Sequence, residues 1–181
     1  SKSRYLFEIV GTFILVYAIC SAATVYSGNK LLGIVGLPPL NMIGVGLVHA
    51  LVLTAIVYAI GYRSGAQVNP AVTIALLVTG KMRGKEAALT IACQILGAVI
   101  AAAVVYSMFG SDMAASVTLP ADGNTIRAFT LETVMTFTLV YVVLATTTSK
   151  NYKIAPLAGV AIGFTLGFNV IFGGSISGGS L

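Results

Sequence analysis

The stretch SGAQVNPAVTIALLVTG, residues 64–80, decides the fold, because it joins a helix start to an apolar run too short to cross a membrane. Asn69 is a favoured residue immediately before a helix, and Pro70 suits the first helical position. Gly80 is a natural stop, so about eleven residues form a helix of roughly 16 Å, half the thickness of the hydrocarbon layer. We therefore expect a half-helix that dips into a membrane and returns. The residues before Asn69 must then line a wet path or be buried in protein.

The alternative is an amphipathic helix that lies on the membrane surface and is capped by the same Asn-Pro pair. A surface helix of that kind carries a polar face. Residues 71–78 are nearly all apolar, which favours the half-membrane helix.

Composition extends this membrane interpretation to the whole chain. Of its 181 residues, 57% are hydrophobic and 8% are charged, whereas a soluble domain carries about a quarter charged residues. This balance excludes an ordinary soluble enzyme or a nucleic-acid-binding module. Since roughly 20 apolar residues span a bilayer, we expect an all-α polytopic membrane protein, with residues 1–181 as one transmembrane channel domain. The predicted spans are Tyr5–Tyr26, Leu40–Gly61, Ala87–Met108, Phe129–Thr148 and Ile154–Phe172.

Lysine and arginine are unevenly divided between the two sides of these spans. One side carries only Lys30 and Arg127. The side of the N-terminus carries eight: Lys2, Arg4, Arg63, Lys81, Arg83, Lys85, Lys150 and Lys153. Because cytoplasmic loops carry the excess of basic residues, the N-terminus is predicted to be cytoplasmic.

The chain also contains an internal repeat. Residues Glu8–Tyr17 match Glu132–Tyr141 at Glu, Val, Thr, Phe, Leu, Val and Tyr, and Ser64–Val68 has a counterpart in Ser177–Leu181. Three spans separate the starts of repeat one (1–110) and partial repeat two (125–181), so the second enters the membrane from the opposite face. Inverted repeats place a functional site near the membrane midplane, where the repeats meet. The pattern therefore predicts a transporter or a channel.

These motifs resemble the aquaporin, or major intrinsic protein, family, and the resemblance covers essentially the whole chain. It implies six spans, two re-entrant half-helices that meet through two Asn-Pro-Ala turns, and a homotetramer with a pore in each protomer. Here five spans are present and the sixth is missing. By the repeat alignment, the second Asn-Pro-Ala would begin one residue after Leu181. We therefore expect the sequence to be part of a longer protein that continues with this motif, a filter arginine and the sixth helix.

The resemblance also assigns pore residues. The pore motif is Asn69, Pro70 and Ala71, and the selectivity filter is His49, Val170 and Gly179. The carbonyl tracks come from Gly65, Ala66 and Gln67 and from Gly178, Gly179 and Ser180. His49 with a small aliphatic residue and a glycine looks like the filter of plant tonoplast-type aquaporins, which include members that pass ammonia. The membrane is expected to be the cell membrane, with the vacuolar membrane as an alternative.

Glu8 and Glu132 are carboxylates within apolar spans, where a charge is expensive and is by default a functional hypothesis. By resemblance they support the re-entrant loops, together with Gln94. The leading interpretation is a passive channel that conducts water and excludes protons and ions. Ammonia and other small neutral solutes are further candidate solutes. A proton-coupled transporter that uses Glu8 and Glu132 and a non-conducting structural membrane protein remain alternatives. No catalytic residue, metal site, cofactor or nucleic-acid partner is expected; the expected partners are water, small neutral solutes and membrane lipid.

Overall fold

A computed structural model describes residues 2–26, 42–148 and 155–181. Five helices in these ranges are long and apolar enough to cross a membrane: α1 (Ser3–Tyr26), α2 (Met42–Ser64), α4 (Gly84–Phe109), α5 (Thr125–Thr148) and α6 (Ala158–Ser177). The half-helix α3 (Pro70–Val78) and the 3-10 helices η2 (Gly110–Ser116) and η3 (Ala155–Leu157) complete the order. The prediction of an all-α polytopic protein is confirmed. Lys30, Lys150, Lys153 and the predicted span starts Leu40 and Ile154 lie outside the described residues.

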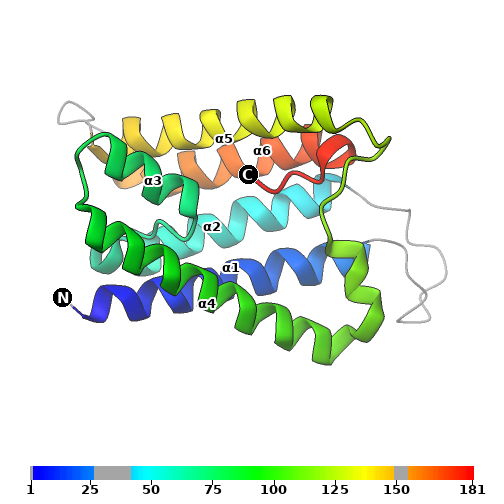
Figure 1. Ribbon diagram of the computed structural model, residues 1–181, viewed down its shortest axis with the longest axis horizontal. Coiled ribbons are helices and arrows are strands. Elements are labelled where there is room, and N and C mark those ends of the chain that lie inside the picture. Colours follow the sequence, from blue (N-terminus) through cyan, green and yellow to red (C-terminus); the bar gives the residue numbers. More distant parts are fainter. Residues whose placement is uncertain (1, 27–41, 149–154) are drawn as a thin grey trace.

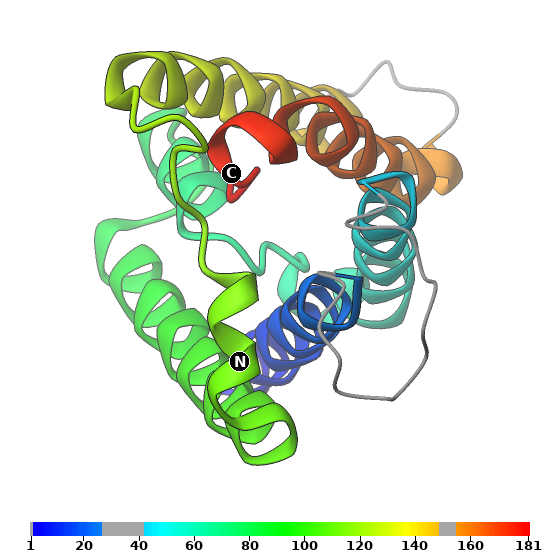
Figure 2. The same cartoon turned by 90° about the vertical axis from the view of Figure 1, so that its right-hand side faces the viewer.

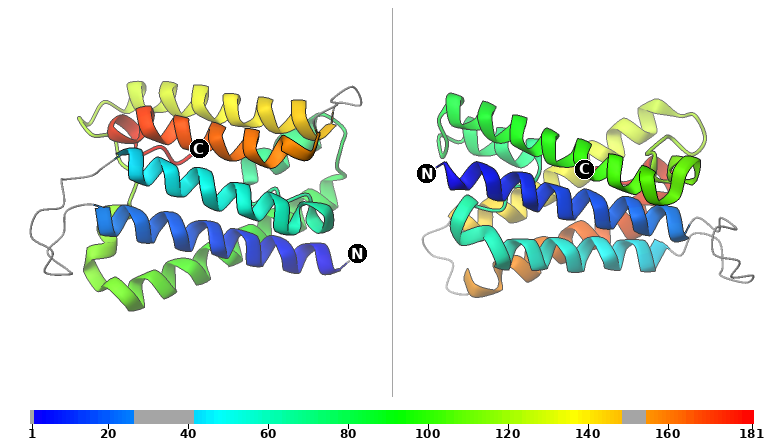
Figure 3. Two further views of the ribbon diagram at one scale, coloured as in Figure 1. Left: turned by 180° about the vertical axis from the view of Figure 1, so that it is seen from behind. Right: turned by 90° about the horizontal axis from the view of Figure 1, so that it is seen from below.

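The helices are arranged side by side around a common axis. Figure 1 shows α3 above the crossing of α4 and α1, and Figure 2, which looks along the helices, shows α1, α2, α6, α5, α3 and α4 in a ring. Figure 3 shows α2 between α1 and α6. The most extensive helix contacts join α2 to α6 and α1 to α4. The re-entrant segment thus closes the ring between α4 and α5.

Small residues allow the closest helix approaches. A Cβ added at Gly163 of α6 would lie 2.4 Å from the Ala50 carbonyl oxygen of α2, and one at Gly97 of α4 would lie 2.4 Å from the Ile9 carbonyl oxygen of α1. Neighbouring backbones therefore touch at these glycines. In lipid, where no hydrophobic force drives helices together, such close packing is a main source of association.

The last span differs from its prediction, Ile154–Phe172, at its described end. The helix α6 continues to Ser177 because Gly173 and Gly174, which look like stop signals, are packing positions. A Cβ at Gly173 would meet the Met135 sulfur, and one at Gly174 would meet the Met42 methyl group. The helix ends instead at Gly178, whose φ of 93° is the left-handed conformation favoured after a helix.

Candidate functional site

The first re-entrant loop, residues 65–68, is held by the carboxylate of Glu8 on α1. The Gln67 and Val68 amides donate to its two oxygens at 3.1 and 2.9 Å. The Gln94 side chain on α4 donates to it at 2.9 Å. Glu8 is fully buried, and burying an unpaired charge would be very costly. These three donors therefore compensate the carboxylate and at the same time fix the loop.

A threonine that sequence reasoning missed completes this network. The Thr73 hydroxyl donates to the Gln67 side-chain oxygen at 2.7 Å and accepts from the Gln94 side-chain nitrogen at 3.0 Å. Thr73 is fully buried on α3, one turn after Asn69. Its only sequence signal is a hydroxyl in an otherwise apolar half-helix. Thr73 therefore couples the half-helix to α4 and to the loop.

Asn69 caps α3 as predicted. Its side-chain oxygen accepts from the Ala71 amide at 2.7 Å, and Pro70 occupies the first helical position. Its side-chain nitrogen donates to the carbonyl oxygen of Leu181 at 2.9 Å. Asn69 is thus the point at which the first re-entrant segment touches the segment after α6.

The segment after α6 is held by Glu132 of α5 in the same manner. The amides of Ser180 and Leu181 donate to the Glu132 carboxylate at 3.2 and 2.9 Å. The hydroxyls of Ser177 and Ser180 donate to it as well. Unlike Glu8, Glu132 is only half-buried. Both glutamates singled out from the sequence therefore bind the backbone of a loop.

The two loops share one backbone conformation. The φ angles are 95° and 93° at Gly65 and Gly178, 46° and 63° at Ala66 and Gly179, and 43° and 51° at Val68 and Leu181. In each loop a serine hydroxyl accepts from the amide two residues later, at 3.0 Å for Ser64 and 3.4 Å for Ser177. Since these loops occupy matching positions within the two repeats, after α2 and after α6, the repeat extends from sequence to atomic geometry.

A cavity lies where the first loop faces α1, α2, α5 and α6. Polar groups enter it from residues 65–69, His49, Thr147 and Ser180. Apolar side chains form the remaining lining: Leu15, Ile19, Leu53, Val57, Val72, Leu139, Val143, Ile162 and Leu166. Because polar groups interrupt a mostly apolar lining, the cavity can hold small molecules that form hydrogen bonds.

His49 has a defined orientation within this lining. Its Nδ1 lies 2.8 Å from the carbonyl oxygen of Val45, one turn earlier in α2. A carbonyl only accepts, so Nδ1 carries the proton and Nε2 of the neutral ring remains an acceptor. The histidine can therefore present a hydrogen-bond acceptor to a molecule in the cavity.

The other two expected filter residues do not line this cavity. Val170 is only 1% exposed and belongs to the apolar core. A Cβ at Gly179 would lie 3.5 Å from the Cα of Val170, so these two residues pack against each other. Gly178 is also absent from the lining, which takes Ser180 from this loop. The structure thus lines one cavity with His49, Gly65, Ala66, Gln67, Asn69 and Ser180, whereas Val170, Gly178 and Gly179 are not among its lining residues.

Comparison with known proteins gives consistent matches. The profile described as "Major intrinsic protein" matches residues 1–181. Aquaporin NIP3-1 of Arabidopsis thaliana is 38% identical over 182 residues, which cover 96% of this chain and 54% of that protein. Nodulin-26 of Glycine max is 36% identical over 178 residues, which cover 96% of this chain and 61% of that protein. The chain thus spans roughly half to three-fifths of the length of these relatives.

A solved structure agrees on the fold. The X-ray structure of the aquaglyceroporin from Plasmodium falciparum has a TM-score of 0.77 at 19% identity, and covers 98% of this chain and 75% of that one. The expected likeness to tonoplast-type aquaporins is not borne out, because these plant relatives are of NIP type or nodulin-26. That expectation depended on three filter positions, of which Val170 and Gly179 are not among the residues that line the cavity.

Proposed function

Because the chain belongs to the major intrinsic protein family, we propose that it forms a passive membrane channel for water and small neutral solutes that excludes protons and ions. The observation that carries the proposal is the cavity lined by Asn69, in which polar groups of the loop and of His49 interrupt a mostly apolar lining. The matched aquaporins and the aquaglyceroporin likeness support this class of activity. The two loops meet where Asn69 contacts Leu181. The meeting point of two inverted repeats is the expected location of a pathway across the membrane.

The first loop would supply the acceptors of the pathway. The Gln67 and Val68 amides donate to Glu8, and the backbone of the same loop lines the cavity at Gly65, Ala66 and Gln67. We assign the carbonyl oxygens of Gly65, Ala66 and Gln67 to one acceptor track, and those of Gly178, Gly179 and Ser180 to a second. A water molecule could then exchange hydrogen bonds along the path without losing its hydration all at once.

Asn69 and α3 would oppose the passage of protons and cations. The half-helix begins at Pro70, so the positive end of its dipole is at the cavity. The Asn69 side-chain nitrogen is a donor and cannot accept a proton. A neutral water molecule meets a hydrogen-bond donor there, whereas a cation meets a positive potential. Pore diameter, lining groups and half-helix dipoles together are the general basis of such selectivity.

His49 would widen the range of solutes. Its free Nε2 accepts from a donor such as the N–H of ammonia, and its neighbours in the lining include Leu53 and Val57. We retain His49, Val170 and Gly179 as the filter, with Val170 fixing the position of Gly179 through direct packing.

The contacts of the glutamates favour support over a proton relay. Glu8 already accepts three hydrogen bonds, so its protonation would break contacts that hold the loop. We propose that Glu8, Glu132 and Gln94 are structural supports. We also propose a homotetramer in the cell membrane with a cytoplasmic N-terminus, since Arg63, Lys81, Arg83 and Lys85 lie at that end of the described spans.

The test is osmotic shrinkage of vesicles that contain the full-length protein, followed by light scattering in a stopped-flow instrument. Vesicles with the protein should shrink much faster than empty ones, at the same rate with and without a pH gradient. A rate equal to that of empty vesicles would refute the channel and favour a structural membrane protein. A rate that follows the pH gradient would favour the coupled transporter.

A further inference from the structure

The segment Val117–Asn124, here called the bracing segment, joins η2 to α5 and passes beside the loop after α6 (Figure 2). The Ala121 amide donates to the Ile176 carbonyl oxygen in the last turn of α6 at 3.0 Å. Thr118 lies directly against Gly178: a Cβ added at Gly178 would be 2.5 Å from the Thr118 Cβ and 2.7 Å from its Cα. The bracing segment therefore contacts the same loop that Glu132 holds.

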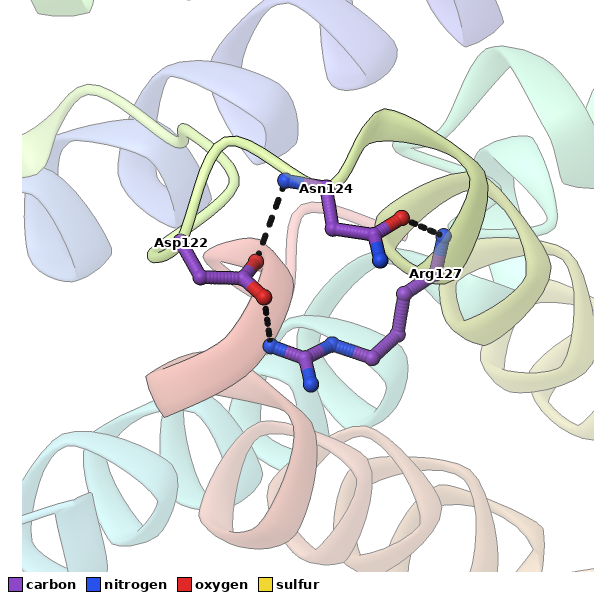
Figure 4. Close-up of polar contacts among 3 residues, drawn as sticks. All are labelled: Asp122, Asn124 and Arg127. Atoms are coloured by element: carbon purple, nitrogen blue, oxygen red, sulfur yellow. Dashed lines mark hydrogen bonds and ion pairs between the residues drawn. The ribbon is translucent and has the colours of Figure 1, made fainter.

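The bracing segment is itself fixed where it enters α5. The Asp122 carboxylate accepts from the Asn124 amide at 3.1 Å and forms an ion pair with Arg127 (Figure 4). The Asn124 side-chain oxygen accepts from the Arg127 amide at 3.0 Å and so caps the helix. The Asn124 amide first, and then the Arg127 guanidinium, hold the pKa of Asp122 below its usual value. An ionised Asp122 therefore locks the geometry of this end.

Two backbone hydrogen bonds fix the ends of the bracing segment. The Gly123 amide donates to the Pro120 carbonyl oxygen at 3.2 Å, which closes a turn with Ala121 as its second residue. At the η2 end, the Val117 amide donates to the Ala114 carbonyl oxygen at 3.2 Å. A segment bonded at both ends can transmit a fixed position to whatever it contacts in between.

The first loop is positioned differently. A Cβ added at Gly65, the counterpart of Gly178, would have only the Gln67 side chain of its own loop within 4 Å. That loop is instead fixed by Gln94 and Thr73 through side-chain hydrogen bonds. Among the described residues, none makes with Gly65 the close contact that Thr118 makes with Gly178.

We propose that the bracing segment determines solute selectivity, with Thr118 and the Ala121 amide as positioning groups. By fixing Gly178 and the end of α6, they set where Gly179 and the cavity-lining Ser180 stand. The width of the passage on this side would follow from the bracing segment, although none of its residues lines the cavity. The inference rests on the proposed channel function and extends it to a part of the chain that the resemblance did not assign.

The discriminating variant is Ala121→Pro in the full-length protein. Proline is favoured at the second position of a turn, so this change fits the Pro120–Gly123 turn. It removes the N–H donor and places the proline Cδ against the Ile176 carbonyl oxygen, so it breaks the contact between the bracing segment and α6. Ala121→Ser is the matched control, because it keeps the N–H. Thr118→Gly, which removes the Cβ that Gly178 contacts, is a second variant should the first fail to assemble.

Two readouts are measured on the same preparations. Hydrogen exchange of residues 176–181 should quicken by about five-fold in Ala121→Pro, since one hydrogen bond of ordinary net strength is lost. The ratio of glycerol to water permeability should change by about two-fold or more, with Ala121→Ser equal to the wild type. Thr118→Gly should shift the ratio in the same direction.

Faster exchange with an unchanged permeability ratio would overturn the proposal, because the bracing segment would then be structural only. Unchanged exchange would also overturn the proposal, because the hydrogen bond from Ala121 would then not hold the end of α6 in place. If the wild type passes no water at all, the proposed channel function fails. Faster exchange of residues 176–181 in Ala121→Pro would then show that the contact exists even though the channel function does not.

Discussion

Replacing Glu8 with glutamine tests whether the buried carboxylate supports the loop or moves protons. The side chain keeps its size, but one of the two oxygens becomes an NH2 donor. In the wild type, the Glu8 carboxylate accepts from the Gln67 and Val68 amides and from the Gln94 side chain. With an amide in its place, any orientation leaves at least one backbone N–H of the loop facing another donor.

The magnitude follows from these contacts. An unsatisfied buried donor costs about 1–3 kcal/mol, and the remaining bonds lose the strength that a charged acceptor gives them, about 1 kcal/mol. Glu8→Gln should therefore destabilise the protein by about 2–4 kcal/mol. Glu132→Gln is the matched comparison in the other repeat. A glutamine there also turns an NH2 toward the amide of Ser180 or Leu181. Glu132 is only half-buried and Ser180 is exposed, so water can satisfy the displaced N–H, and the Ser177 and Ser180 hydroxyls can rotate and accept instead. The cost should therefore be nearer about 1 kcal/mol.

The assay is thermal unfolding of the two variants in lipid nanodiscs, together with water permeability under a pH gradient. We expect Glu8→Gln to lower the midpoint several degrees more than Glu132→Gln and to reduce water flux by loosening the loop. Equal midpoints for Glu8→Gln and the wild type, with flux that loses a dependence on the pH gradient, would refute the support role. That outcome would favour a role of Glu8 in proton transfer.

Four further outcomes are expected. Gly163→Ala should cost about 2 kcal/mol or more in thermal unfolding, because its Cβ would lie 2.4 Å from the Ala50 carbonyl oxygen; a neutral result would mean that α6 can shift. Asn69→Asp keeps the helix cap but replaces the donor with a negative charge, so proton leak measured with a trapped pH dye should rise while water flux continues. His49→Phe should lower ammonia flux and retain water flux, and unchanged ammonia flux would remove His49 from the filter. Because the folded pKa of Asp122 is lowered, its contribution to stability is present above the ordinary value of 3.8 and is lost only as the pH falls below it. The protection factors of residues 117–124, which are exchange rates corrected for the pH dependence of unstructured amides, should therefore stay constant at pH 5–7 and fall near pH 3.

What could be predicted from the sequence were features with a local or chemically rare signature. The Asn69–Pro70 cap is local, and its hydrogen bond to Ala71 appears as expected. Glu8 and Glu132 were conspicuous because a carboxylate in an apolar span has few explanations. Both bind the loop of their own repeat.

Features that depend on packing between distant elements gave no such signal. Thr73 looked like one threonine in an apolar helix, and only the fold brings it to Gln94. Gly173 and Gly174 carry a stop signal that close contact with Met135 and Met42 overrides. Val170 was located by counting along the chain, and counting does not reveal which face of α6 meets the cavity.

The span of sequence between Glu8 and its partners has a consequence for biosynthesis. Its donors lie 59, 60 and 86 residues further along the chain. At about 5–20 residues per second, a ribosome needs several seconds to deliver them after α1 has emerged. Throughout this interval α1 carries a carboxylate with no partner, at a cost of about 3 kcal/mol for entry into lipid. The first helix is therefore expected to wait in the insertion machinery and to enter the bilayer together with α2, α3 and α4, as one assembly step and not as four.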